Sequence, residues 1–403
     1  MKRLPIRGGN WNNAATSGVF ALNLNNVRSN VNTSVGARPA SGDRPKRHAY
    51  RACRQYTLKR TRSPRPGRPP EAETFNRQAV PVARHRAAVR PCRPTPMAKT
   101  YNNLFPQIYA FENLHAAYLR ARKGKRDRHE VRRFEQDLEG NLIQLQNELI
   151  WGEYRTGQYR RFMVEEPKHR EVAALPFRDR VVQHALVGVI EPLWEACFIA
   201  DSYACRPGRG THRGADRAQA MLRKVKRKHG QLYALKADIA KYFASIDHGI
   251  LRRLLRRRIS CTSTLALCDE IIASTADQDD LAPRGLPIGN LTSQLWANVY
   301  LDDLDRFVKH DLNLRNYIRY MDDFVVVHHD KAALHGTRRQ IEEFLWDRLR
   351  LQTNSKTQVF PVSAGRGRGL DFLGYHMWPT HRRLRRASIR RIARTLKKAQ
   401  RRY

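Results

Sequence analysis

The stretch that decides the fold is Tyr320-Met321-Asp322-Asp323-Phe324-Val325-Val326-Val327. Two adjacent carboxylates precede a run of aromatic and β-branched residues, which is typical of a buried strand entered through a turn. A second apolar run, Leu232–Ile239, also has the composition of a strand and carries Asp238 near its end. We therefore expect Asp322 and Asp323 at a hairpin turn, beside a neighbouring strand that contributes Asp238.

Adjacent carboxylates repel each other and are costly unless a cation neutralises them. A third carboxylate would complete a cluster of hard oxygen ligands, which prefer Mg²⁺ to zinc. Two such ions about 4 Å apart can activate a hydroxyl and stabilise a phosphate leaving group. An Asp-Asp pair alone is usually only a turn, and the chain also contains Asp279-Asp280 and Asp302-Asp303. The flanking strand and the upstream Asp238 set Asp322-Asp323 apart.

Charge is the strongest compositional feature of the 403 residues, because 76 Lys and Arg face 37 acidic residues, a formal net charge of +39. Such an excess implies a polyanionic partner. A membrane surface would also attract it, but we find neither an apolar run of about 18 residues nor a secretory signal. We therefore expect a nucleic-acid partner in the cytoplasm and no membrane. The six cysteines form no Cys-x-x-Cys pair and are expected to be reduced thiols.

Three zones differ in composition. Residues 1–40 are rich in Asn, whereas residues 41–96 contain 15 Lys/Arg, three acidic residues and nine Pro. A basic, proline-rich stretch of this kind should be a disordered linker. Residues 97–403 should be globular, with an amphipathic helix over 134–149. Strands separated by helices predict the α+β class, with a mostly antiparallel sheet buttressed by helices.

Five ordered motifs resemble those of reverse transcriptases: Asp238 through Phe243, Gly289-x-x-x-Ser293-Gln294, Tyr320-Met321-Asp322-Asp323, Lys356, and Phe372-Leu373-Gly374. The resemblance covers about residues 100–403, with the reverse transcriptase domain over about 160–378. It implies a right-hand polymerase fold, and an RNA-directed DNA polymerase with template RNA and the RNA/DNA duplex as partners. The helical fingers would span 97–230, the antiparallel-sheet palm 231–375 and the short basic helical thumb 376–403.

The resemblance also assigns roles at the expected metal site. Asp238 and Asp322 would hold two Mg²⁺ ions with Asp323 alongside, and the backbone carbonyl of Ile239 would add a ligand. Phe243 matches the position that stacks under the incoming sugar and excludes a 2′-hydroxyl, which implies dNTP substrates; an ordinary core position is the alternative. Further contacts to nucleotide or template are expected from Gly289, Ser293, Gln294 and Tyr320.

Cations in the expected fingers resemble groups that contact phosphates. Lys168 and Arg170 match the segment that grips the triphosphate, where they would neutralise developing charge; contact with the RNA backbone is the alternative. Two further motifs, Arg178-Asp179-Arg180 and Tyr203-Ala204-Cys205-Arg206-Pro207, are expected to position the template.

Three features lie toward the C-terminus. Lys356 matches a lysine that can protonate pyrophosphate, with a plain surface lysine as the alternative. Phe372-Leu373-Gly374 would form the turn that seats the primer end. Residues 379–403 contain 11 Lys/Arg and no acidic residue, and they have one apolar helical face, which suits a helix that grips duplex phosphates. A solvated tail is the other interpretation.

The loop Leu286–Gln294 narrows the type of reverse transcriptase. Group II intron and retron enzymes carry Gln where this chain has Ile288, and Pro where it has Gln294. The loop instead resembles diversity-generating retroelement enzymes, which copy a template-repeat RNA with errors at adenine and rely on a small basic accessory protein. Asn codons begin with two adenines, so the Asn-rich residues 1–40 resemble a translated template repeat, and we expect them to be joined in frame to an enzyme that begins at Met97. A small genuine N-terminal module is the alternative.

Two alternatives stay open. A retron or group II intron enzyme is the nearest, although an intron maturase would need a further RNA-binding domain that we do not expect in the 29 residues after Gly374. A non-catalytic RNA-binding scaffold with a polymerase fold is the alternative from another class, and the intact carboxylates argue against it.

Overall fold

The computed structural model describes residues 99–164, 170–275, 283–365 and 367–401, which all belong to one compact unit. The expected template-repeat segment 1–40 and the linker 41–96 lie outside the described residues, so both remain predictions.

The first described elements form a helical cluster. The single helix expected over 134–149 is two helices, because Asp137 accepts a 3.1 Å hydrogen bond from the N–H of Gly140 and so caps a new helix. The cluster comprises α2 (Phe105–Tyr109), α3 (Phe111–Ala121), α4 (His129–Glu135) and α5 (Leu138–Ile150).

Two long apolar helices join this cluster to the rest of the fold. Helix α6 (Phe177–Glu195) packs against α3 on one side and against α11 (Leu291–Arg306) on another. Most residues of both helices are buried, as expected for helices apolar on several faces. Between them in sequence lie α7 (Thr211–His229), α8 (Tyr242–Ser245), α9 (His248–Arg256) and α10 (Thr262–Ala273), and η1 (Phe307–Asp311), a π-helix, follows α11.

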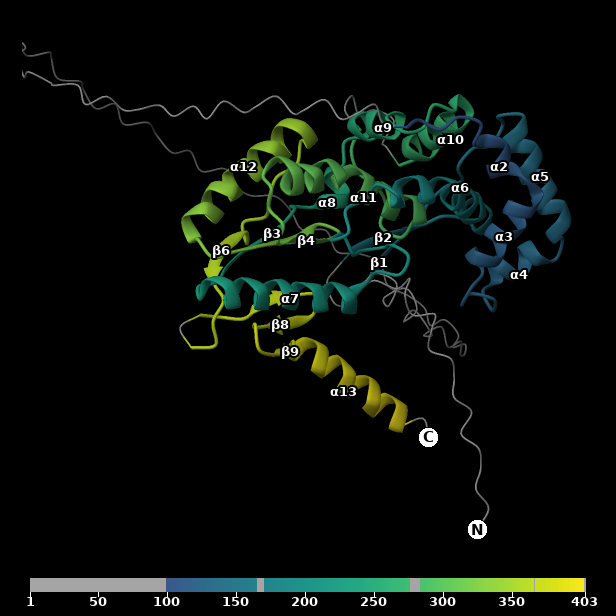
Figure 1. Ribbon diagram of the computed structural model, residues 1–403. Helices are drawn as coiled ribbons and strands as arrows, with labels where there is room; N and C mark the ends of the chain where they lie inside the picture. The colour runs from purple at the N-terminus through teal and green to yellow at the C-terminus, as the bar shows by residue number, and fades with distance from the viewer. Residues whose placement is uncertain (1–98, 165–169, 276–282, 366, 402–403) are drawn as a thin grey trace, which may run out of the picture. The chain divides into compact units, whose positions relative to one another are not determined.

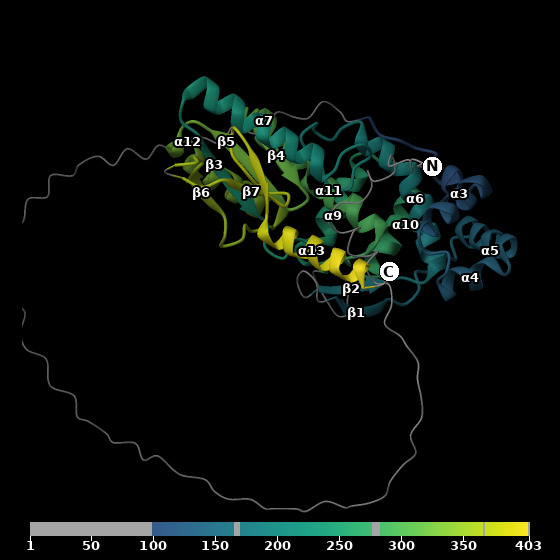
Figure 2. The same cartoon turned by 90° about the horizontal axis from the view of Figure 1, so that it is seen from below.

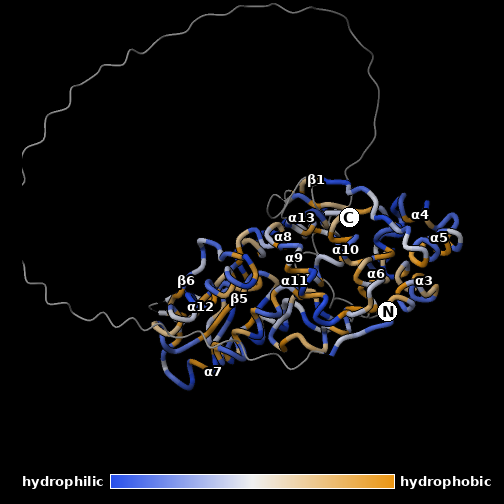
Figure 3. Tube along the Cα trace, turned by 90° about the horizontal axis from the view of Figure 1, so that it is seen from above, coloured by the Kyte–Doolittle hydropathy of each residue, from blue (hydrophilic) through white to orange (hydrophobic). Residues whose placement is uncertain are grey.

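A four-stranded antiparallel sheet has the strand order β4-β5-β3-β6. Its bounds are β3 (Tyr233–Asp238), β4 (Tyr317–Tyr320), β5 (Asp323–His328) and β6 (Gln358–Pro361). Strand β5 is one of the two inner strands, and its middle residues Phe324–Val327 are apolar and buried on both faces of the sheet (Figure 3). Helix α12 (Lys331–Leu349) packs on β3, β5 and β6, while α7 packs on β4 and β5 from the opposite side (Figure 1). The α+β class and the antiparallel sheet are confirmed.

Two smaller sheets complete the described fold. One is the hairpin of β1 (Arg160–Val164) and β2 (Arg170–Ala174); the other joins β7 (Leu370–Phe372), β8 (Tyr375–Met377) and β9 (Arg382–Leu384). The helix expected from residue 376 begins later, because β8 and β9 precede α13 (Arg386–Gln400). Helix α13 projects away from the four-stranded sheet (Figures 1 and 2), and none of its residues is buried.

Candidate active site

The adjacent carboxylates lie at the tight turn between β4 and β5. Tyr320 pairs with Asp323 across the hairpin, so Met321 and Asp322 alone form the turn. Met321 has a left-handed backbone, with φ of 56°, which is uncommon for a residue with a side chain. The expected hairpin is therefore present, with Asp322 in its turn and Asp323 at the start of β5.

Asp238 ends β3 and is the direct register partner of Asp323 on the neighbouring antiparallel strand. Side chains of directly opposite residues lie on the same face of a sheet. The N–H of Ile239 donates a 3.3 Å hydrogen bond to the carbonyl oxygen of Asp322, which ties the turn to the end of β3. The three aspartates thus meet at the same end of two neighbouring strands.

A lysine lies beside these carboxylates. Lys236 precedes Asp238 by two residues and so shares its face of β3. The Lys236 Nζ atom is 3.5 Å from Oδ2 of Asp323 and donates a 2.7 Å hydrogen bond to the carbonyl oxygen of Asp371. The Asp371 carboxylate in turn forms an ion pair with Arg385. One chain of polar contacts therefore connects the candidate site to the sheet β7–β9.

The electrostatics of the site suit a hard cation. Burial first, and then the charges of Asp238 and Asp322, raise the pKa of Asp323 to about 7, although Lys236 and Arg385 act in the opposite direction. The Asp323 Oδ1 atom is buried and has no hydrogen-bond partner among the described residues. An orphaned carboxylate oxygen beside like charges matches Mg²⁺ in charge and donor type.

The carboxylates would not enclose such an ion alone. In the part of the chain that the structure describes, no group of three or more His, Cys, Asp and Glu side chains is gathered closely enough to hold a metal ion. Mg²⁺ usually keeps several waters and takes further oxygens from substrate phosphates. The site therefore fits Mg²⁺ as a partial ligand set that substrate would complete.

The segment that contains Lys356 is tied to Asp238 through Asn354. The Asn354 N–H donates to the Asp238 carbonyl oxygen at 2.6 Å, and its Nδ2 atom lies 3.4 Å from Oδ2 of Asp238. Lys356 is exposed in the following turn, where its N–H donates to Oδ1 of Asn354 at 3.1 Å. Asn354 thus brings this segment to the site, while the proton-donor role of Lys356 stays a prediction.

Phe243 follows the end of β3 in the short helix α8. Its side chain is 9% exposed, and its carbonyl oxygen accepts a 2.8 Å hydrogen bond from the N–H of Leu286. This position lies just beyond Asp238 and against the loop that begins at Leu286. Sugar stacking and an ordinary core position both remain compatible with such burial.

The loop before α11 lies against β2. The Ile288 carbonyl oxygen accepts a 3.2 Å hydrogen bond from the N–H of Ala173. Gly289 has φ of 123°, and a Cβ atom there would lie 3.2 Å from Val172 Cγ1 and 3.3 Å from the Ala173 carbonyl oxygen. Only glycine meets both demands without strain. The first turn of α11 follows with Ser293, which is buried, and Gln294, which is partly buried.

The turn expected at Phe372-Leu373-Gly374 is present between β7 and β8. Leu373 and Gly374 form it with φ of 52° and 85°. The Gly374 carbonyl oxygen accepts a 3.0 Å hydrogen bond from the N–H of Arg385. The same arginine forms an ion pair with Asp371, which also accepts the hydrogen bond from Lys236. Arg385 therefore connects the turn to the chain of contacts that begins at Lys236. Its contact with a primer end stays a prediction.

The cations expected to grip the triphosphate lie largely outside the description. Lys168 falls in the undescribed residues 165–169, and Arg170 begins β2 without a described side chain. Their assignment therefore remains a prediction.

The cations of the motif Arg178-Asp179-Arg180, expected to position the template, form ion pairs with acidic side chains. Arg178 forms an ion pair with Glu148, and Arg180 pairs with Glu130 at 2.7 Å. These contacts hold helices α4, α5 and α6 to one another, and contact of either arginine with template stays a prediction.

Arg206 is the clearest correction. It is 5% exposed, its Nε and Nη2 atoms donate to the Glu195 carboxylate, and its Nη1 atom donates to two backbone carbonyl oxygens. A buried guanidinium with its donors engaged cannot contact template. The motif Tyr203–Pro207 suggested an exposed cation, because burial and long-range partners are invisible in a local pattern.

Sequence reasoning missed two residues that touch the site. Lys236 had a usable signal, since it lies two positions before Asp238 and strand residues two apart share a face. Asn354 lies two residues before Lys356, but nothing in the sequence connects its side chain to Asp238.

Comparison with known proteins identifies the family. The model of the family "Reverse transcriptase (RNA-dependent DNA polymerase)" matches residues 165–377, which is more than half of the chain. The chain therefore belongs to the reverse transcriptase family and is an RNA-directed DNA polymerase. The mixed helical and antiparallel-sheet architecture agrees with the polymerase fold expected from the motifs.

Individual relatives are more distant. Protein YkfC of Escherichia coli is 27% identical over 272 residues, 58% of this chain and 70% of that protein. The group II intron-encoded protein LtrA of Lactococcus lactis is 27% identical over 214 residues, 51% of this chain but 34% of LtrA. An apo telomerase from Candida tropicalis has a TM-score of 0.43 at 12% identity. The aligned region covers 59% of this chain and 58% of the telomerase chain. The chain thus spans only about a third of LtrA. Among the described residues, no helix has the length and apolarity needed to cross a membrane.

Proposed function

We propose that this reverse transcriptase extends DNA at a centre formed by Asp238, Asp322 and Asp323 with two Mg²⁺ ions. The observation that carries the proposal is the register pairing of Asp238 with Asp323, with Asp322 in the adjoining turn. Asp238 and Asp322 would hold the ions, with Asp323 alongside and the Ile239 carbonyl as a further ligand. Bound Mg²⁺ would activate the primer 3′-hydroxyl and neutralise charge on the departing pyrophosphate.

The chain's own side chains orient these ligands. Asn354 contacts both the backbone and the carboxylate of Asp238, and Lys236 lies against Asp323. Partners of this kind fix the orientation of metal ligands. Phe243 would exclude ribonucleotides by its bulk, and exposed Lys356 would donate a proton to pyrophosphate.

The partners follow from the family and from the charge. An RNA template and the RNA/DNA duplex suit a chain with a net charge of +39. In this proposal the fingers span 97–230, the palm 231–375 and the basic thumb 376–403. Triphosphate and template contacts would come from Lys168, Arg170, Gly289, Ser293, Gln294 and Tyr320.

Primer extension on an RNA template tests the metal assignment. Wild type should extend a DNA primer with dNTPs only when Mg²⁺ is present, and Asp322→Ala should give no product. Asp303→Ala is the matched control, because Asp303 belongs to another Asp-Asp pair and makes a peripheral 2.7 Å ion pair with Arg257. Equal product from Asp322→Ala and wild type would contradict the assignment.

We further propose that the enzyme is of the diversity-generating type and copies a template-repeat RNA with errors at adenine. The support is the loop Leu286–Gln294, which has Ile288 and Gln294 at the two diagnostic positions. A small basic accessory protein would be a partner. The alternative is a group II intron-type enzyme, which the similarity to LtrA favours; a retron enzyme is compatible as well.

Sequencing the cDNA separates these types. Substitutions concentrated opposite template adenines would support the diversity-generating type, and uniform high fidelity would support the intron-type alternative. Ile288→Gln should change misincorporation opposite adenine, and an unchanged error spectrum would exclude this residue as a determinant.

The N-terminal residues are proposed to have no catalytic role. A 40-residue Asn-rich segment with few apolar anchors could hardly fold alone. A chain starting at Met97 should therefore keep the full rate of primer extension, and loss of activity would refute the proposal.

A further inference from the structure

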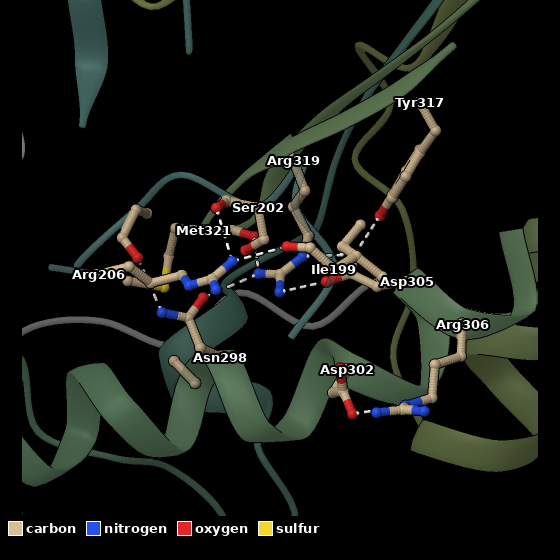
Figure 4. A network of polar contacts seen from close by, with 12 residues as sticks. Ile199, Ser202, Arg206, Asn298, Asp302, Asp305, Arg306, Tyr317, Arg319 and Met321 are labelled. Atoms are coloured by element: carbon tan, nitrogen blue, oxygen red, sulfur yellow. Dashed lines mark hydrogen bonds and ion pairs between the residues drawn. The ribbon is translucent and has the colours of Figure 1, made fainter. Parts of the chain in front are cut away.

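Arg319 lies on β4 in a fully buried ion pair. Its side chain and that of Asp305 are both 0% exposed, with Nε 2.8 Å from Asp305 Oδ1 and Nη2 2.7 Å from Oδ2 (Figure 4). Burying two charges is expensive unless their geometry is excellent and their remaining donors are satisfied. This pair has that geometry. The third guanidinium nitrogen, Nη1, does not contact Asp305 and must therefore find acceptors elsewhere.

The Nη1 atom of Arg319 reaches the turn that carries the catalytic carboxylate. It donates to the Met321 carbonyl oxygen at 3.0 Å and to Oδ1 of Asn298 at 3.1 Å (Figure 4). The peptide bond is planar, so the Met321 carbonyl and the Cα atom of Asp322 belong to one rigid unit. Holding the Met321 carbonyl in place therefore also sets the orientation of the Asp322 backbone.

The guanidinium is itself immobilised from several sides. Tyr317 donates to Oδ1 of Asp305 at 2.7 Å, and Asn298 donates to the Ala204 carbonyl oxygen at 2.8 Å. The Arg319 backbone is held as well, because its N–H donates to the carbonyl oxygen of Asp201 at 3.0 Å. Met321, whose carbonyl oxygen Arg319 holds, has a left-handed φ of 56°. A strained backbone of this kind persists only where surrounding contacts hold it in place.

We infer that Arg319 is a positioning residue for polymerisation, which sets the orientation of Asp322 through the Met321 carbonyl. The inference rests on the proposed metal-binding role of Asp322. It distinguishes Arg319 from an ordinary buried ion pair, whose loss lowers stability without changing the geometry of the turn. Arg319 touches neither substrate nor metal; it acts only through Met321.

Arg319→Lys tests this role. A lysine keeps the charge opposite Asp305, but its single ammonium cannot reproduce the planar fork that reaches both Asp305 oxygens and the Met321 carbonyl. Tyr317→Phe is the matched control, since it removes a hydrogen bond to the same carboxylate but keeps every contact of the Arg319 guanidinium, including the one to the Met321 carbonyl. Both variants should lower the melting temperature, and only Arg319→Lys should affect the site.

Two readouts identify the effect on the site. The first is Mn²⁺ binding to the complex of the protein with primer–template and a non-hydrolysable dNTP analogue, which completes the partial ligand set; it is followed by electron paramagnetic resonance and needs no activity. The second is the single-turnover extension rate at saturating primer–template. We expect Arg319→Lys to raise the Mn²⁺ Kd and to lower the rate, each by about ten- to hundredfold, while Tyr317→Phe stays within about twofold of wild type. Equal Mn²⁺ Kd and rate in both variants would overturn the inference.

The outcomes separate this inference from the proposed function. If wild type binds Mn²⁺ and Asp322→Ala does not, the metal assignment stands, and the comparison of Arg319→Lys with Tyr317→Phe decides the role of Arg319. If Asp322→Ala binds Mn²⁺ as wild type does, the metal assignment fails first. Should Arg319→Lys not fold, Asn298→Ala removes the other acceptor of Nη1, and it should shift the Mn²⁺ Kd in the same direction; an unchanged Kd would count against the inference.

Discussion

The Lys236 ammonium lies between two chain segments, 3.5 Å from the Asp323 carboxylate and 2.7 Å from the carbonyl oxygen of Asp371 on β7. It is the leading charge that lowers the pKa of Asp323 against burial and against the neighbouring carboxylates. Lys236 therefore performs two tasks, because it compensates charge at the site and links the site to the sheet β7–β9.

Lys236→Met should remove that compensation while keeping the bulk of the side chain. The pKa of Asp323 should rise further, so the rising limb of the pH–rate profile should move to higher pH, and the rate at pH 7 should fall about tenfold. Single-turnover extension measured between pH 6 and 9 checks the shift. Lys224→Met, at an exposed position of α7, is the control and should leave the profile unchanged. A lower rate with an unshifted profile would mean that Lys236 acts only as a link.

Asp323 also predicts how stability depends on pH in the metal-free protein. Its pKa rises from the ordinary 3.8 to about 7 on folding, so the native state binds more protons than the unfolded state between these values. The contribution of Asp323 to stability is therefore fully present below about pH 4 and is lost as pH rises through 7. Urea unfolding in EDTA at several pH values should show a smaller loss in Asp323→Asn than in wild type, because burial also raises the pKa of Asp302, to about 6, and that contribution stays. Added Mg²⁺ should restore stability most at the higher pH values, because binding requires the ionised carboxylate.

The part of the site that sequence could predict is the part encoded locally. The strand that carries Asp238 and the hairpin that carries Asp322 each follow from a short apolar run beside a carboxylate, and the pairing of the two strands follows from their motif order. Arg319 and Asn354 could not be recognised, since their partners lie on other elements. The prediction for Arg206 was wrong because it assumed that a charged side chain would be exposed. In the structure the side chain is buried and forms an ion pair with Glu195.

The helices around residues 134–149 also differ from what the local sequence pattern predicted. Apolar spacing over residues 134–149 predicts one helix, and the structure has α4 and α5 in that range. The spacing survives the break because Phe134 and Leu142 both face the same core. Asp137, which caps α5, is a residue type typical of helix N-termini. A single capping residue is, however, a weaker indication of a helix boundary than the uninterrupted apolar spacing around it is of one continuous helix.

Asn354→Ala should loosen Asp238. The variant loses the side-chain contact to Asp238 Oδ2 but keeps the N–H that donates to the Asp238 carbonyl oxygen. We expect the single-turnover rate to fall about tenfold, with little change in the affinity for primer–template. Ser355→Ala is the control, because Ser355 is exposed and its Oγ atom donates at 3.3 Å to Oδ1 of Asn354, whereas Nδ2 is the Asn354 atom that lies near Asp238. Equal rates in the two variants would show that the backbone contact alone positions Asp238.

Gly289 offers a test of how tightly the loop before α11 must approach β2. Gly289→Ala places a methyl group 3.2 Å from Val172 Cγ1 and 3.3 Å from a carbonyl oxygen, at a φ of 123° that alanine rarely adopts. The free energy of unfolding should fall by about 1–3 kcal/mol, and the loop that carries Ile288 should shift, so extension should weaken as well. Urea unfolding and primer extension measure the two effects.

Gly336→Ala is the matched control for Gly289→Ala. Gly336 lies within α12, and apart from its chain neighbours and the backbone of its own helix no atom lies within 4 Å of the added methyl group. Alanine is favoured over glycine in a helix by about 1 kcal/mol. The same chemical change should therefore stabilise the protein at residue 336 and destabilise it at residue 289. If both variants were stabilised, the close approach of Gly289 to β2 would not constrain the loop.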